Sequence, residues 1–150
     1  MSNETQRMSE LNLGDRIESP SILVSAKAVH TAECLGKVKE VLKLIAAESI
    51  NGTWPNDDEW LDQLPSWFTQ PFQDRTIEQV LADESLWDYG SWLDAMRHRG
   101  WQWWSSSTDD DEIKITLQRE DDVYSIEPLV YLVRQCGASS VQVTESFPPA

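Results

Sequence analysis

The chain has 150 residues, of which 40% are hydrophobic and 25% charged, and its formal net charge is -14 at pH 7. This length suits one compact core, and the apolar fraction is too high for an intrinsically disordered chain. The excess of 26 acidic over 12 basic residues disfavours contact with phosphate backbones, so we expect no direct binding to nucleic acid and favour a basic protein partner.

The two ends of the chain are polar or rich in proline and lack a sustained hydrophobic period. We therefore expect a flexible lead over residues 1–20, a single α+β domain over residues 21–146 and a short tail over residues 147–150. The lead lacks the basic start and apolar run of a signal peptide, and no segment is apolar for the length of a membrane helix. Cys34 and Cys136 lack CxxC spacing, which indicates reduced, buried thiols. These features predict a cytoplasmic protein without membrane contact.

The N-terminal half is expected to be mainly helical. Residues 22–29 are apolar and partly β-branched, which favours a strand, although alanine and lysine there also suit a helix. Thr31 is expected to cap a helix, whose apolar residues recur at helical spacing until Asn51 and Gly52 end it. In residues 54–72 prolines interrupt a series of aromatic residues, which predicts short helical turns separated by bends.

Two further helices are predicted before the C-terminal third of the chain. Residues 76–79 match a capping box, in which Thr76 and Gln79 each bond the other's backbone N–H, so a helix should start there. Gly90 is expected to break that helix, and Ser91 is expected to cap a short one that ends at Gly100.

The hydrophobic period then changes from helical to strand-like. Residues 101–104 and 112–118 alternate apolar and polar side chains around a polar loop, which predicts an antiparallel hairpin. A helix is expected between a cap at Ser125 and a stop at Gly137, followed by a last strand around Val141. Because a helix joins them, the last strand should run parallel to the second hairpin strand. The C-terminal half is thus an α-β-β-α-β unit with a small mixed sheet covered by helices.

Eight tryptophans are the most unusual feature of the sequence, and Trp104 is the candidate anchor of an interface. Trp101 and Trp103 share one face of their strand, so Trp104 faces the other side, where an exposed indole would be a binding hot spot. The alternative is that both faces of the strand are buried and Trp104 belongs to the core. Acidic residues at both ends of the hairpin complete the predicted partner-binding set: Asp109, Asp110, Asp111, Glu112, Glu120, Asp121 and Asp122.

Metal and catalytic chemistry have little support in the sequence. The hairpin acids lack the alternating oxygen ligands and turn glycine of a calcium loop, and a solvated turn explains them. His30 and His98 have no second ligand at zinc-like spacing, and His98 suits the C-terminal end of a helix. No phosphate loop, dinucleotide fingerprint or GxSxG motif is present, so no cofactor is expected. Catalysis would need dispersed carboxylates such as Glu59, Asp94 or Glu127.

The acidic and aromatic character of the chain recurs where Asp57, Asp58, Glu59 and Asp62 surround Trp60 and Leu61. In this general character the chain resembles bacterial immunity proteins and toxin inhibitors. The resemblance implies a non-catalytic, protein-binding domain that occludes the site of a basic partner such as a toxin. Two alternatives stay open: a small carboxylate-dependent or metal-dependent enzyme, and a structural or assembly subunit that self-associates through its tryptophans.

Overall fold

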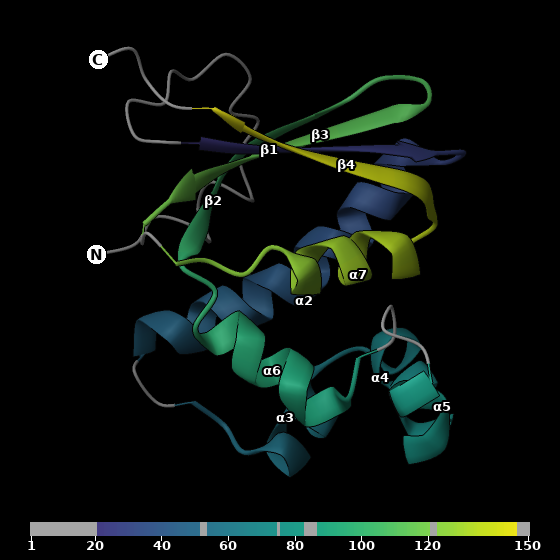
Figure 1. Cartoon of the computed structure of the whole chain (residues 1–150), viewed down its shortest axis with the longest axis vertical. Coiled ribbons are helices and arrows are strands. Elements are labelled where there is room, and N and C mark those ends of the chain that lie inside the picture. Colours follow the sequence, from purple (N-terminus) through teal and green to yellow (C-terminus); the bar gives the residue numbers. More distant parts are fainter. Residues whose placement is uncertain (1–20, 52–53, 75, 83–86, 121–122, 147–150) are drawn as a thin grey trace.

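A twisted antiparallel sheet lies on one side of the molecule, and helices are layered beneath it (Figure 1). This computed structural model describes residues 21–51, 54–74, 76–82, 87–120 and 123–146. The expected lead and tail, residues 1–20 and 147–150, lie outside the described residues. The elements in chain order are β1 (Ser21–Ala28), α2 (Thr31–Asn51), α3 (Asp57–Gln63), α4 (Ser66–Asp74), α5 (Ile77–Ala82), α6 (Tyr89–Arg97), β2 (Trp101–Thr108), β3 (Glu112–Arg119), α7 (Glu127–Gln135) and β4 (Ala138–Ser146). The expected α+β class is confirmed.

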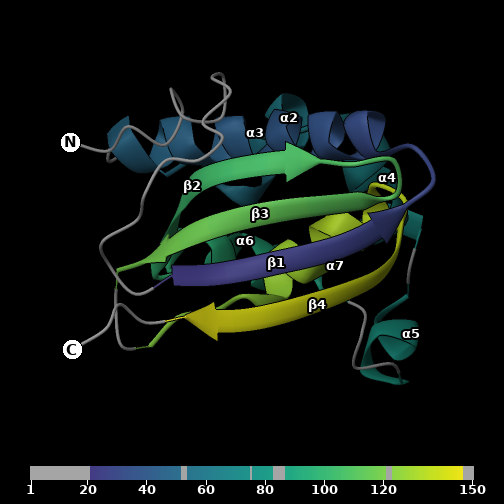
Figure 2. The same ribbon diagram turned by 90° about the horizontal axis from the view of Figure 1, so that it is seen from above.

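The four strands are ordered β2-β3-β1-β4, and every neighbouring pair is antiparallel. The predicted hairpin of β2 and β3 is confirmed. β4 runs in the same direction as β3, as the α7 connection requires, but β1 lies between them (Figure 2). The expectation of a mixed sheet is therefore wrong, because β1 separates the two parallel strands and is antiparallel to both.

Two helices, α2 and α7, lie beneath the sheet and form its main cover (Figure 1). With them the order of elements is β-α-β-β-α-β, the split arrangement of ferredoxin-like folds, and α3 to α6 are an insertion between α2 and β2. None of the described helices has the length and apolar character needed to cross a bilayer.

The core forms where the alternating strands face the periodic helices. Ile22, Val24 and Ala26 of β1 are buried and pair with buried residues of β3, so one face of both strands is apolar. The buried side chains on β3 are Ile113, Ile115 and Leu117, and those on α2 include Val38, Val41, Leu42 and Ile45. The period of each segment thus decides which of its faces is buried.

An aromatic cluster joins the inserted helices to this core. Phe68 of α4 lies 4.6 Å from Trp92 of α6 and 5.3 Å from Phe72, measured between ring centroids. The Trp92 indole donates a hydrogen bond to the backbone oxygen of Pro128 in α7 (3.0 Å). This cluster therefore fixes α6 against α7, and it positions the residues on the far side of α6.

Local hydrogen bonds explain where two helices begin. The predicted capping box is confirmed, since Gln79 N donates to Thr76 Oγ1 (3.1 Å) and Thr76 N to Gln79 Oε1 (2.9 Å). α2 begins at Thr31, as expected, but the Thr31 hydroxyl donates to the backbone oxygen of Asp109 (2.8 Å). That bond fastens the start of α2 to the tip of the hairpin.

Two predicted helix starts are wrong. Gly90 lies inside α6, and the cap is Asp88, whose carboxylate accepts the Ser91 N–H at 3.1 Å. An aspartate caps more strongly than a glycine breaks a first turn, because it satisfies an otherwise unpaired donor. α7 starts after Ile126 without a side-chain cap, so Ser125 has no capping role.

Candidate functional site

The predicted acidic tip of the hairpin, residues 109–112, lies beside the start of α2. Its first three side chains are exposed, whereas Glu112 is half-buried. The Nζ of Lys27 lies 3.7 Å from Asp111 and 3.4 Å from Glu112, and the Nζ of Lys114 lies 3.6 Å from Glu112. Lysines thus partly neutralise the tip, although such exposed ion pairs contribute little to stability.

The second predicted acidic group does not join the first. Glu120 follows β3 and accepts a hydrogen bond from Gln102 Nε2 (3.0 Å). It is separated from the tip by the eight residues of β3, roughly 26 Å of strand. Asp121 and Asp122 lie outside the described residues. The described acids of the predicted set therefore occupy opposite ends of the hairpin.

Trp104 stands apart from the other tryptophans of β2. Trp101 and Trp103 are each 1% exposed, whereas Trp104 is half-buried. The register shifts between Trp103 and Ser105, so Trp104 occupies a bulge in β2. This position outside the buried core agrees with the strand parity, while its use as an interface anchor stays a prediction.

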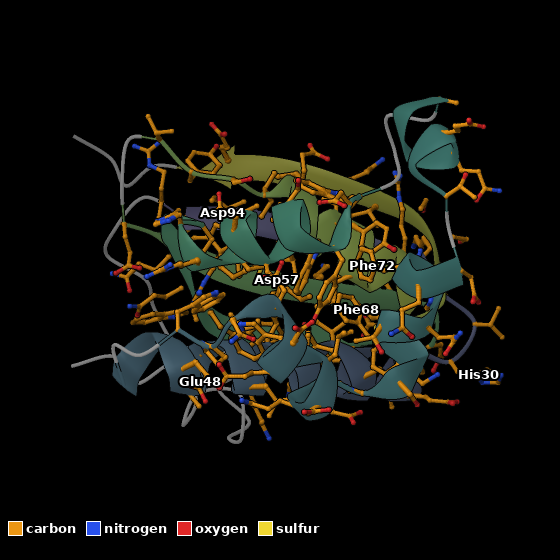
Figure 3. The ribbon with its side chains drawn as sticks, turned by 90° about the horizontal axis from the view of Figure 1, so that it is seen from below. His30, Glu48, Asp57, Phe68, Phe72 and Asp94 are labelled. Carbon is orange, nitrogen blue, oxygen red and sulfur yellow. The ribbon has the colours of Figure 1, made fainter. Side chains whose placement is uncertain are left out.

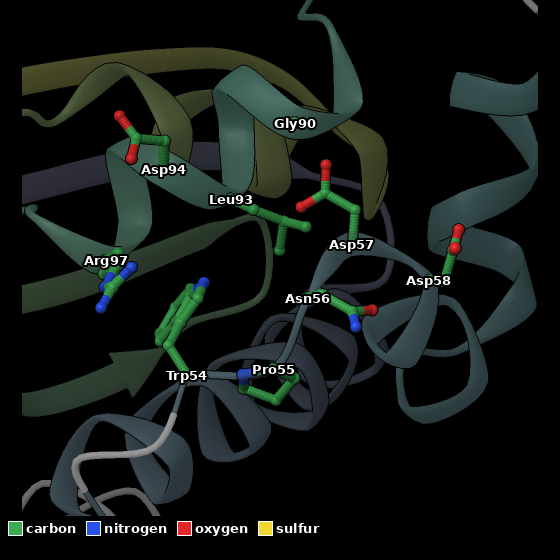
Figure 4. Close-up of a pocket in the computed structure, with 9 residues that line it drawn as sticks. All are labelled: Trp54, Pro55, Asn56, Asp57, Asp58, Gly90, Leu93, Asp94 and Arg97. Atoms are coloured by element: carbon green, nitrogen blue, oxygen red, sulfur yellow. The ribbon is translucent and has the colours of Figure 1, made fainter.

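A cleft of about 710 Å³ opens on the helical side of the molecule, between the start of α3 and the outer face of α6 (Figure 4). We call it the acidic-aromatic cleft. Its lining residues come from two segments of the chain and not from the hairpin: Trp54, Pro55, Asn56, Asp57, Asp58, Gly90, Leu93, Asp94 and Arg97. Figure 3 shows Asp57 and Asp94 on this helical side, far from His30 at the end of the molecule.

The first segment is shaped by the start of α3. Asn56 Oδ1 accepts from Glu59 N (2.9 Å), and Asn56 N donates to Glu59 Oε1 (3.4 Å), which completes a capping box. Asp57 and Asp58 follow in the first turn, where the positive end of the helix dipole favours their carboxylates. Capping thus explains why these acids are ordered beside Trp54 at the rim of the cleft.

The starts of α3 and α6 meet at Asp57. Tyr89 Oη donates to the backbone oxygen of Asp57 (3.1 Å), and a Cβ at Gly90 would lie 3.1 Å from Asp57 Oδ2. The backbone of α6 at Gly90 thus lies directly against the Asp57 carboxylate. Burial, followed by the charges of Asp57 and Asp58, raises the pKa of Tyr89 above its ordinary value, so this phenol stays protonated and keeps its donor.

Trp54 forms the aromatic wall of the cleft. Its ring lies 5.0 Å from that of the buried Trp60, in an edge arrangement, which holds it against the core. The Arg97 guanidinium lies over the same ring at 5.8 Å (Figure 4). Three carboxylates against one guanidinium, beside an indole, make a negatively charged site that suits an organic cation.

The sequence revealed one half of this site. The mixture of acids and aromatic residues after Trp54 was visible, but nothing in the sequence linked it to Gly90, Asp94 and Arg97. Among the dispersed carboxylates considered for catalysis, Asp94 lines the cleft, while neither Glu59 nor Glu127 does. In the part of the chain that the structure describes, no group of three or more His, Cys, Asp or Glu side chains could hold a metal ion.

The two cysteines line a smaller cavity of about 230 Å³, formed by the end of β1, the start of α2 and the turn between α7 and β4. Both thiols are free and buried, as predicted. Burial raises the pKa of Cys34, and it raises that of Cys136 to about 12. Since the thiolate is the reactive form, these thiols are core groups rather than nucleophiles.

Compared with protein-family models, curated proteins and solved structures, the chain matches none. Its arrangement of strands and helices is one that hosts many unrelated functions. The function must therefore be inferred from the chemistry of the site itself.

Proposed function

We propose that this chain is a non-catalytic, acidic protein-binding domain that docks on a basic partner, in the manner of an immunity protein or inhibitor that occludes the partner's site. The observation that carries this proposal is the acidic-aromatic cleft, where Asp57, Asp58 and Asp94 surround the wall formed by Trp54. A lysine or arginine side chain of the partner would enter this cleft.

The chemistry of the cleft supports a cationic guest. A cation over a tryptophan ring gains about 0.5–2 kcal/mol, depending on how far it is desolvated. Arg97 already lies over the Trp54 ring, so a guanidinium is compatible with this wall. Carboxylates at the rim would then hydrogen-bond the guest and contribute more than solvent-exposed charges do.

The rest of the surface would act at longer range. A net charge of -14 attracts a basic protein before contact, and this attraction is screened beyond about 10 Å at 0.1 M salt. The exposed acids of the hairpin tip would contribute to this steering. We therefore expect the tip to affect the association rate and the cleft to affect the lifetime of the complex.

The first test compares two variants with the same change of charge. Asp57, Asp58 and Asp94 are changed to asparagine in one variant, and Asp109, Asp110 and Asp111 in the other. Binding of a fluorescent arginine-rich decapeptide is measured by anisotropy. The cleft variant should bind at least about tenfold more weakly, the equivalent of 1.4 kcal/mol, and the tip variant less than about threefold. Equal losses would mean that the peptide senses only net charge, and would contradict the proposal.

The second test separates the indole from the charges. Trp54→Leu should weaken binding by about tenfold through the loss of the cation–π contact. Trp67→Leu is the matched control, because Trp67 is also half-buried and carries Lys37 over its ring at 5.5 Å, but lies outside the cleft. Thermal unfolding of each variant shows whether it is folded. A natural partner is then a protein that wild type retains from a cell extract and the cleft variant does not.

A further inference from the structure

The strand β4 forms an edge of the sheet and pairs, within the described part of the chain, with β1 alone. It is nine residues long, and after a register shift opposite Lys27 and Ala28 its residues 140–146 pair with β1 in a regular register. Its only charged residue is Glu145, and it has no proline. Long, regular, uncharged edges present unpaired backbone groups and are templates for another strand.

The opposite edge of the same sheet is protected. β2 carries the bulge at Trp104, which interrupts its ladder in the middle of the strand. A bulge and a covering helix are the usual devices that prevent an edge from pairing. β4 also has a register shift, opposite Lys27 and Ala28, and α7 packs against it, but this shift lies near the start of the strand. The seven residues 140–146 then pair with β1 without interruption, which leaves a longer regular edge than β2 has on either side of its bulge.

The sequence of β4 is complementary to itself. When a second copy runs antiparallel about Gln142, Val143 lies opposite the second copy's Val141, within the regular part of β4. Glu145 then faces the irregular start of the second copy's β4 and not its Glu145. Both valines are on the face of β4 that points towards the helices, because they pair with buried residues of β1. Val143 is 39% exposed in the single chain, so this pairing would cover it without opposing two carboxylates.

We propose that β4 is a dimerisation edge, to which a second copy of this chain adds its own β4 about Gln142. The two sheets of four strands then form one continuous sheet with the helices of both copies on the same side. The net charge of -14 on each copy opposes this contact, so salt should strengthen the dimer. Binding of a basic guest in the cleft should weaken with salt, which separates this inference from the proposed function.

Single cysteines test the register directly. Two Gln142 residues on the axis would have their Cα atoms about 4.5–5.5 Å apart, within the range of a disulfide. Two Thr144 residues would be roughly 13 Å apart, beyond that range. With oxidised glutathione, which takes up the two electrons and two protons of the thiols, Gln142→Cys should form a covalent dimer of twice the 17.2 kDa chain mass. Thr144→Cys and wild type should remain single chains under the same conditions.

Matched valine variants test the contact without a cross-link. Val143→Glu should weaken the dimer at least about tenfold in sedimentation equilibrium. Val123→Glu carries the same charge change at another exposed valine, and should dimerise like wild type. Raising the salt from about 0.05 M to about 0.5 M should tighten the wild-type dimer.

A wild type that stays monomeric up to about 1 mM at the higher salt would overturn the inference. Equal cross-linking of the Gln142→Cys and Thr144→Cys variants would overturn it as well. So would a dimer that Val143→Glu leaves intact, because the copies would then associate through another surface, such as the tryptophans.

Discussion

The same substitution at two buried tryptophans should have different effects on the free energy of unfolding. Trp60 and Trp92 are both 0% exposed. The Trp92 indole donates to Pro128, whereas the Trp60 Nε1 has no hydrogen-bond partner among the described residues. Changing either residue to phenylalanine keeps a buried aromatic ring and removes the N–H. The difference between the two variants therefore measures the hydrogen bond.

The magnitudes follow from the partners. The smaller ring leaves a cavity that costs ~1 kcal/mol in each variant. Trp92→Phe also loses a hydrogen bond of net value ~1 kcal/mol, since the Pro128 oxygen can still accept within its own helix, so the free energy of unfolding should fall by about 2 kcal/mol. Trp60→Phe removes a buried donor whose burial without a partner costs about 1–3 kcal/mol, so this variant should be neutral or more stable than wild type.

Urea unfolding followed by far-UV circular dichroism is the suitable assay, because eight tryptophans complicate fluorescence. The free energy of unfolding of Trp60→Phe should exceed that of Trp92→Phe by about 2 kcal/mol or more. This corresponds to a difference in Tm of at least about 4–8 °C for a domain of this size. If Trp60→Phe destabilises the protein as much as Trp92→Phe, the Trp60 N–H is paired in the native protein and the reasoning is refuted.

Three other changes have defined signs. Gly36→Ala, in α2 with no atom from the rest of the fold within 4 Å of the added Cβ, should raise the free energy of unfolding by about 0.5–1 kcal/mol. Gly100→Ala should lower it by about 2 kcal/mol or more in the same urea assay, because φ is +78° and the Cβ would lie 2.7 Å from Val123 O; equal effects of the two changes would contradict this. The Cys136 thiol should stay protonated to about pH 12 in the folded chain and ionise near pH 9.0 in the unfolded chain. Unfolding therefore releases a proton between these pH values, so the free energy of unfolding falls as the pH rises. This group contributes a fall of up to about 1.4 kcal/mol per pH unit. Cys136→Ala should flatten this dependence in urea titrations at pH 8 and pH 10.5, and an unchanged slope would show that the thiol does not contribute.

The two proposed contacts lie on different parts of the molecule. The cleft is built on α3 and α6, on the helical side, and β4 is an edge of the sheet on the other side (Figure 1). A dimer formed through β4 would leave both clefts open, and could present two of them to a basic partner. The opposite salt dependences of the two contacts allow each to be measured in the presence of the other.

The sequence by itself determined the features that depend on near neighbours. The alternation of Ile113, Ile115 and Leu117 specified a strand and its buried face, and the polar loop before it specified a hairpin. The capping box of Thr76 and Gln79 is likewise complete within four residues. These features are local because strand parity, helical period and caps involve side chains that are close in the chain.

Only the tertiary structure decided which buried face meets which. β1 pairs with strands more than 80 residues away and enters between β3 and β4, a choice between competing pairings that the apolar pattern of β1 does not encode. The cleft likewise joins Asp57 to Asp94 because the start of α6 meets the start of α3, where the Tyr89 hydroxyl donates to the Asp57 backbone oxygen. A hydrophobic pattern specifies that a face must be covered, but the covering partner is selected by the packing of the whole chain.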